Sequence, residues 1–286
     1  MPSRRIVIRT VTDMLAYPDI RSERISQALM GEWVEAQSER NGFVEARTEY
    51  GYSGWIWADS LVGEYTPPQL SNHCPGYPRY AQIRSAYATL WKMERHDQTV
   101  AVMAMGSIVM VELEKGGTAI VTLPDGRTGR MERKDLAPIP ESHRPNVRRV
   151  IETGMRLLGV PYLWGGISTF GIDCSGFTQR VYRQHGILMP RDAYLQAEWE
   201  GSVRVSAGEL QAGDLLFFGQ DQPDSRGRTI THVGMAIGDG LFIHSSGNWG
   251  VHVSSLSEEY YQRRWRCSRR VLAGKTVERP TRHLPV

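Results

Sequence analysis

The first half of the chain contains an internal repeat, and this repeat constrains the fold more than any other feature. The segment MGEWVEAQSERNGFVEARTEYGYSGWIWADSL, residues 30–61, matches MGSIVMVELEKGGTAIVTLPDGRTGRMERKDL, residues 105–136, at a constant offset without a gap. Gly31 aligns with Gly106 at the start of the match. A fixed-period match of this length indicates two copies of one structural unit.

Each copy of the repeat has the periodicity of short β-strands. The runs EWVEA, GFVEA and GWIWA in the first copy, and SIVMVEL and TAIVTL in the second, alternate in hydrophobicity, and RNG, YSG and PDG are turn sequences. We therefore expect a small all-β barrel from each copy. Stretches rich in proline and polar residues, 65–78 and 137–146, read as linkers. The predicted domains are 1–66, 76–140 and 145–275.

Composition narrows the class of protein. The chain has 286 residues, of which 41% are hydrophobic, and its net charge of +3 is too small to argue for a nucleic-acid partner. No run approaches the roughly 18 apolar residues that span a bilayer, so we expect no membrane insertion. No signal peptide is visible, which predicts a cytoplasmic protein, or an exported or periplasmic one if a signal was removed. Three cysteines without ligand spacing argue against a disulfide framework and a zinc site.

The second half contains a cysteine in a position suited to chemistry. In FGIDCSGFTQRVYRQHG, residues 170–186, apolar residues recur at helical spacing after Cys174. Cys174 therefore lies at or just before the first turn of a helix, where unpaired N–H groups and the helix dipole favour a thiolate. The small neighbours Ser175 and Gly176 leave the sulfur approachable and leave backbone N–H groups for an oxyanion.

Two histidines lie on a predicted β-hairpin, THVGMAIGDGLFIHSSG. If residues 238–240 form a three-residue loop, position 234 faces 244, and His232 and His244 share one face of the sheet. A two-residue loop would place them on opposite faces. We interpret Cys174 as a nucleophile, His232 as general base and then acid, and His244 as the residue that orients His232. The alternative is a buried structural cysteine with two hydrogen-bonded hairpin histidines.

Five motifs in residues 145–272 follow one another in the order of a known family: PYLWGG, DCSGF, MPRDAYLQ, LQAGDLLFFG and HVGMAIGDGLFIHSSG. This region resembles the NlpC/P60 family of cysteine peptidases. The repeats resemble bacterial SH3-like (SH3b) domains, whose Gly-x-x-Gly-Trp signature is kept as GYSGW in the first copy and replaced by GRTGR in the second. The resemblance implies two small all-β SH3-like barrels followed by an α+β papain-like domain. It also implies a catalytic set of Cys174, His232 and His244, with no metal or organic cofactor.

The combination of two SH3b modules with this domain resembles the γ-D-glutamyl-L-diamino acid endopeptidases. That resemblance implies cleavage of peptidoglycan stem peptides after γ-D-Glu, with a free N-terminal L-Ala, and release of L-Ala-D-Glu. The implied substrate-binding residues are Tyr52 and Asp192 at the amine, Trp164 in the wall of the cleft, Asp173 and Ser175 beside the nucleophile, and Glu23 as a second acidic contact. A helix N-cap is the alternative role for Asp192, core packing for Trp164 and a surface charge for Glu23.

Two other functions stay open on the same scaffold. One is a wall-binding adaptor with an inactive peptidase domain, and the other is an acyltransferase or amidase. The expected partners are peptidoglycan-derived peptides, and we expect a monomer. The sequence leaves open whether lysine or diaminopimelate follows the D-Glu.

Overall fold

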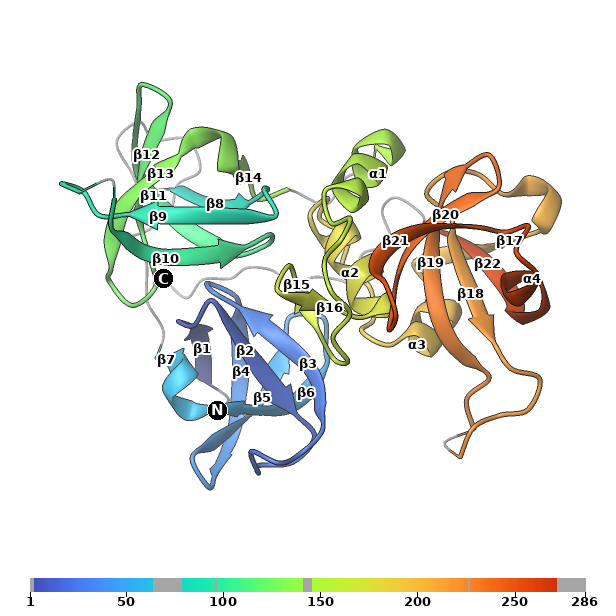
Figure 1. The fold of residues 1–286 in the computed structure, drawn as a ribbon. Helices are drawn as coiled ribbons and strands as arrows, with labels where there is room; N and C mark the ends of the chain where they lie inside the picture. Colours follow the sequence, from blue (N-terminus) through green and yellow to red (C-terminus); the bar gives the residue numbers. More distant parts are fainter. Residues whose placement is uncertain (1–2, 64–78, 96, 141–145, 226, 272–286) are drawn as a thin grey trace. The chain divides into compact units, whose positions relative to one another are not determined.

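The computed structural model describes residues 3–63, 79–95, 97–140, 146–225 and 227–271 (Figure 1). The chain forms two compact units that do not follow the order of the sequence. The first comprises Met1–Ile139 and Trp164–Phe170, and the second comprises Pro140–Leu163 and Gly171–Val286. The predicted domain boundaries at residues 66, 76, 145 and 275 lie outside the described residues, so the division into three domains stays a prediction.

The first repeat forms a seven-stranded antiparallel sheet, drawn in blue in Figure 1. Its strand order is β3-β2-β6-β5-β4-β1-β7. Its buried face collects alternating residues, among them Met14, Val34 and Ile56, into one hydrophobic cluster. The strands are β1 (Ser3–Val7), β2 (Val11–Leu15), β3 (Arg24–Leu29), β4 (Trp33–Arg40), β5 (Phe43–Thr48), β6 (Ser53–Trp57) and β7 (Leu61–Val62).

The second repeat forms a sheet with the same connectivity, in the order β10-β9-β13-β12-β11-β8-β14. Each of its strands occupies the place of the strand seven numbers earlier in the first sheet, so the structure confirms the duplication and the all-β character expected of SH3-like barrels. The strands are β8 (Arg79–Ile83), β9 (Tyr87–Trp91), β10 (Thr99–Ala104), β11 (Ile108–Lys115), β12 (Thr118–Thr122), β13 (Thr128–Glu132) and β14 (Leu136–Pro138).

The two glycines of each Gly-x-x-Gly motif are needed for different physical reasons. Gly51 has a φ of +83° and its equivalent Gly126 a φ of +86°, so both adopt turn conformations that other residues disfavour. Gly54 has no such φ, but a Cβ there would lie 2.5 Å from Cγ of Met14, and a Cβ on Gly129 would lie 2.4 Å from the Trp91 carbonyl oxygen. The second glycine is therefore required where β6 or β13 closes against its neighbouring strand.

The second unit combines helices with a six-stranded antiparallel sheet in the order β17-β22-β18-β19-β20-β21. Helix α2 packs against β19 and β20, and its residues Phe177 and Val181 are fully buried. The strands are β17 (Ser202–Val205), β18 (Leu215–Gly219), β19 (Ile230–Gly238), β20 (Leu241–Ser246), β21 (Gly250–Ser255) and β22 (Trp265–Val271). The helices are α1 (Val147–Met155), α2 (Cys174–Arg183), α3 (Ala193–Glu198) and α4 (Glu259–Arg264).

A short sheet of β15 (Ile167–Ser168) and β16 (Gly171–Ile172) precedes α2. None of the helices in the described ranges has the length and apolar character needed to cross a lipid bilayer.

Candidate active site

Helix α2 begins at Cys174, as the sequence predicted. Its N-cap is Asp173, whose side chain accepts a hydrogen bond from the Gly176 N–H at 2.7 Å. The Cys174 side chain is nearly buried, at 8% exposure. The thiol has a backbone hydrogen bond with Val233, the residue that follows His232 in β19.

The two hairpin histidines are in direct contact. His232 Nε2 and His244 Nδ1 lie 2.7 Å apart, and their rings are almost perpendicular, with an interplanar angle of 84°. His244 is completely buried. Since Nε2 of His232 is engaged with His244, Nδ1 is the ring nitrogen that remains for a proton from the thiol.

The predicted three-residue hairpin loop is wrong, although the predicted pairing beyond it is right. Gly238 pairs with Leu241, so the turn contains only Asp239 and Gly240. Both have positive φ, +51° and +71°, as a type I′ turn requires. A β-bulge between Ala236 and Gly238 then absorbs one extra residue, so that Ala236 still faces Phe242. The bulge restores the parity that a two-residue loop alone would have broken.

The protonation states of the site differ from the expected thiolate. Burial, and then the charge of Asp173, raises the pKa of Cys174 to about 12, against the lowering effect of backbone N–H groups. Burial lowers the pKa of His232 to about 4 and that of His244 to about 2. The helix N-terminus therefore does not produce a thiolate here, because desolvation outweighs it. Burial therefore favours the neutral thiol and the neutral imidazoles over their charged forms.

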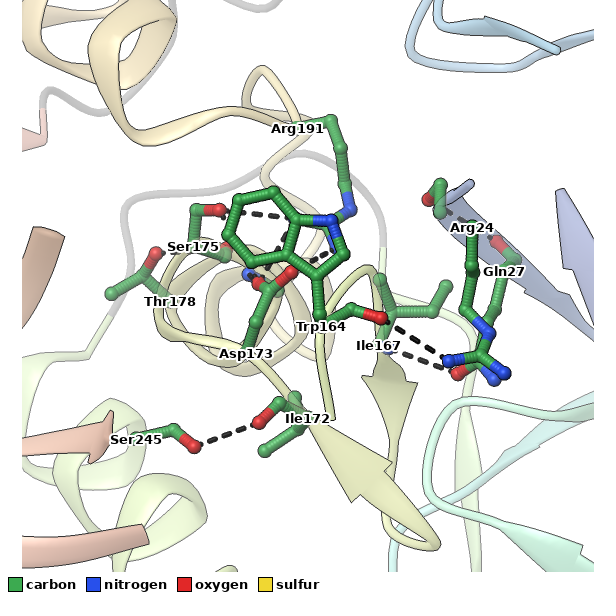
Figure 2. Close-up of polar contacts among 12 residues, drawn as sticks. Arg24, Gln27, Trp164, Ile167, Ile172, Asp173, Ser175, Thr178, Arg191 and Ser245 are labelled. Carbon is green, nitrogen blue, oxygen red and sulfur yellow. Dashed lines mark hydrogen bonds and ion pairs between the residues drawn. The ribbon is translucent and has the colours of Figure 1, made fainter. Parts of the chain in front are cut away.

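Asp173 and Ser175 belong to a buried network that the sequence did not reveal (Figure 2). Arg191 donates to both carboxylate oxygens of Asp173, at 3.0 and 2.6 Å, and to Ser175 Oγ at 3.0 Å. The side chains of Arg191 and Asp173 are 1% and 8% exposed. A bidentate pair of this kind holds the loop before α3 against the start of α2.

Tyr162 and Asp192 also lie in the second unit. Burial, followed by the charges of Cys174 and Asp173, raises the pKa of the Tyr162 hydroxyl, so this phenol stays protonated. Asp192 occupies the N-cap position of α3, but its side chain makes no capping hydrogen bond. Arg191 and Tyr162 are both missing from the predicted set, although PYLWGG and MPRDAYLQ contain them.

The other predicted substrate-binding residues, Glu23, Tyr52 and Trp164, belong to the first unit. Trp164 Nε1 donates to Glu23 Oε1 at 2.9 Å, and 59% of Trp164 is exposed. Core packing is therefore not the role of Trp164, and Glu23 is more than a solitary surface charge. Tyr52 is half-buried against the core of the first sheet and stacks with Tyr50.

Residues of β3 hold the segment after Trp164. The Ile167 N–H donates to Gln27 Oε1 at 3.1 Å, and Arg24 Nη1 donates to the Trp164 carbonyl at 3.3 Å (Figure 2). Gly165 has a φ of +74°, and a Cβ there would lie 2.6 Å from the Arg24 carbonyl oxygen. Gly165 is thus required by the close approach between this segment and β3.

Comparisons with known proteins identify the family of the chain. Residues 159–270 match the model of the NlpC/P60 family. The chain is 30% identical over 259 residues to a γ-D-glutamyl-L-lysine dipeptidyl-peptidase of Bacillus cereus, covering 86% of this chain and 75% of the relative. It is 28% identical over 275 residues to dipeptidyl-peptidase 6 of Lysinibacillus sphaericus, covering 89% and 92%.

The fold is also that of a solved relative. A crystal structure of an NlpC/P60 family protein from Bacillus cereus superposes with a TM-score of 0.81 at 25% identity, over 94% of this chain and 100% of that chain. The similarity thus extends through the β-rich first half as well as the domain that carries Cys174. The chain belongs to the NlpC/P60 family and is a peptidase of that family.

Proposed function

We propose that this peptidase hydrolyses the bond between γ-D-Glu and the following L-diamino acid in peptidoglycan stem peptides, with Cys174, His232 and His244 as its catalytic residues. The observation that carries the proposal is the 2.7 Å hydrogen bond between His244 of β20 and His232 of β19, where the next residue, Val233, has a backbone hydrogen bond with Cys174. Support for the substrate comes from the γ-D-glutamyl-L-lysine dipeptidyl-peptidase of Bacillus cereus, which this chain matches over 75% of its length.

The reaction proceeds in two steps. Cys174 Sγ attacks the γ-carbonyl carbon of D-Glu while its proton passes to Nδ1 of His232. The tetrahedral intermediate collapses, the carbon–nitrogen bond breaks, and His232 returns the proton to the departing amine. Water then attacks the thioester with His232 again as base, which releases the γ-carboxyl product and restores the thiol. Because the Cys174 thiol and the His232 imidazole both start neutral, the proton moves to His232 as the sulfur attacks.

The free amine of an N-terminal L-Ala is the second element of the proposal. An ammonium group requires carboxylate and hydroxyl acceptors, and Glu23, Tyr52 and Asp192 supply these types. The Trp164 N–H fixes the Glu23 carboxylate in place. Acetylation would remove the positive charge and two N–H donors of the amine, so such substrates are disfavoured. Contacts of Asp173 and Ser175 with substrate stay a prediction, because the described contacts of both side chains point into the Arg191 network.

The test uses the full-length protein with L-Ala-γ-D-Glu-L-Lys and its diaminopimelate counterpart, with products identified by mass spectrometry. The α-linked isomer and the N-acetylated tripeptide serve as matched controls. We expect L-Ala-D-Glu from the free γ-linked peptides, and kcat/KM at least about a hundredfold lower after acetylation. No cleavage of either free γ-linked peptide would contradict the proposed bond, and equal cleavage of the acetylated form would contradict amine recognition.

A further inference from the structure

The hydrogen-bonded chain does not end at His244. His244 Nε2 lies 3.2 Å from Ser254 Oγ on the neighbouring strand β21. Ser254 Oγ lies 3.3 Å from His252 Nε2, and His252 Nδ1 lies 3.0 Å from the carbonyl oxygen of Gly250. Ser254 is 8% exposed, and His252 is half-buried with its ring 4.3 Å from that of His244.

The Gly250 carbonyl at the end of these hydrogen bonds determines which atom donates in each of them. A carbonyl oxygen only accepts hydrogen bonds, so His252 Nδ1 carries a proton. In the neutral imidazole Nε2 then carries a lone pair. The single hydroxyl proton of Ser254 points either to this nitrogen, at 3.3 Å, or to Tyr261 Oη, at 3.4 Å, and in both cases it points away from His244. The Ser254 oxygen therefore presents a lone pair to His244, whose Nε2 is the donor.

The same order of donors and acceptors extends from His244 to His232. With its proton on Nε2, His244 presents a lone pair at Nδ1 and accepts from Nε2 of His232. His232 then has no proton on Nδ1. Burial lowers the pKa values of both histidines, which keeps each ring neutral and limits it to one proton. Nδ1 of His232 is therefore the atom free to accept the thiol proton.

A second hydroxyl competes for the same atom of His244. Tyr261 Oη lies 3.3 Å from His244 Nε2. If Tyr261 donated to that nitrogen, His244 would carry its proton on Nδ1 and donate to His232 Nε2. His232 would then carry its proton on Nδ1 and could not accept one from Cys174. The Ser254 hydroxyl gives its proton to His252 or to Tyr261 itself, so its oxygen presents a lone pair to His244 Nε2 and selects against that arrangement.

We propose that Ser254, oriented by His252, is a positioning residue that fixes the tautomers of His244 and His232 and so keeps Nδ1 of His232 unprotonated. This inference rests on the proposed roles of Cys174 and His232 as nucleophile and base. It adds two residues of β21 to the machinery of the proposed reaction, neither of which contacts substrate in this role.

The experiment reads the tautomers directly and needs no substrate. Two-bond ¹H–¹⁵N spectra of the full-length protein with labelled histidine distinguish a protonated Nδ1 from a protonated Nε2, and His232→Gln and His244→Gln assign the signals. In the wild type at neutral pH we expect both rings protonated on Nε2. A wild-type His232 protonated on Nδ1 would overturn the proposal, whatever the variants do.

The matched variants are Ser254→Thr, which keeps the hydroxyl, and Ser254→Val, which has the shape of threonine but no hydroxyl. We expect the threonine variant to keep the wild-type tautomers, and the valine variant to populate the Nδ1–H form of His232. We expect kcat of the valine variant to fall about tenfold to hundredfold with KM little changed. Wild-type tautomers and kcat in Ser254→Val would contradict the proposal.

The outcome separates this inference from the proposed function. Correct tautomers in a protein that cleaves none of the tested peptides would leave the positioning role standing and remove the substrate assignment. Cleavage of the γ-linked peptides by a protein with reversed tautomers would support the proposed function and overturn the positioning role.

Discussion

At the scale of single residues, the chemistry depends on a thiol that is protected from solvent. Helix position alone predicts a thiolate at Cys174, but a helix dipole acts weakly against the loss of hydration at a nearly buried sulfur. Asp173, the residue that caps the helix, adds a negative charge that opposes ionisation further. In the proposed reaction His232 therefore activates the nucleophile during attack rather than before it.

This state predicts a particular pH dependence. The pKa of Cys174 is raised, so the thiol is protonated at neutral pH, and the pKa of His232 is lowered to about 4, so its ring is neutral above that pH. As the pH falls through about 4, His232 gains a proton and can no longer accept one. We expect kcat/KM to stay level from neutral pH down to about pH 5 and to fall below it.

Ultraviolet absorbance of the thiolate tests the same state without substrate. At neutral pH the wild type and Cys174→Ser should have equal thiolate absorbance, because Cys174 is protonated. An absorbance difference that disappears in His232→Ala would instead show a preformed thiolate–imidazolium pair, which would contradict the neutral resting state.

Residue types and local order were predictable, but partners distant in the chain were not. Cys174 could be placed at a helix start because small residues and a helical stripe follow it directly. Arg191 could not be assigned to Asp173, since no periodicity links a loop arginine to a helix cap across the intervening turns. For the same reason Ser254 and His252 were not recognised as partners of His244, although the same β-rich segment contains them.

At the scale of elements, the start of α2 depends on a buried ion pair. Replacing Arg191 with methionine leaves the Asp173 carboxylate buried without its cation, and such a loss destabilises by about 3–5 kcal/mol. We expect the unfolding transition of the second unit to shift to lower temperature in Arg191→Met, as measured by calorimetry.

The double variant Asp173→Asn/Arg191→Met is the control for that prediction. Asparagine keeps an oxygen for the Gly176 N–H and removes the unpaired charge, so much of the lost stability should return. A transition in Arg191→Met equal to that of the wild type would contradict the structural role of the pair.

The histidine hairpin shows what sequence patterning can and cannot determine about an element. Alternation of apolar residues identified two strands and the residues that share a face. It did not locate the bulge at Ile237, because a three-residue loop and a two-residue turn with a bulge leave the same residues paired beyond them. The preference of Asp239 and Gly240 for positive φ decides between them.

At the scale of the whole molecule, the chain returns to its first unit in the middle of its second. Trp164–Phe170 belongs with the β-rich unit, where Ile167 is fully buried in a cluster with Leu29 and Ala104. Tyr87 Oη also donates to the Thr169 carbonyl, at 2.5 Å. The duplication and the order of motifs were readable from the sequence. This crossing, the return of Trp164–Phe170 to the first unit, was not, because it depends on contacts between segments distant in the sequence.

The crossing predicts that the second half is not independently stable. A fragment of residues 140–286 would expose Ile167 and leave the Ile167 N–H and the Thr169 carbonyl without Gln27 and Tyr87. Burial of one large apolar side chain contributes about 1.5–3 kcal/mol, and each hydrogen bond about 1 kcal/mol. We expect a lower unfolding temperature and partial aggregation in size-exclusion chromatography. A fragment as stable as the same region of the full chain would contradict this account.

The proposed reaction passes through a thioester between Cys174 and the γ-carboxyl group of D-Glu. The direct measurement is acid quenching of the full-length protein during turnover of L-Ala-γ-D-Glu-L-Lys, followed by mass spectrometric peptide mapping. We predict an L-Ala-D-Glu acyl group on the peptide that contains Cys174, and neither acylation nor products with Cys174→Ala. Release of L-Ala-D-Glu by Cys174→Ala at the wild-type rate would contradict the account.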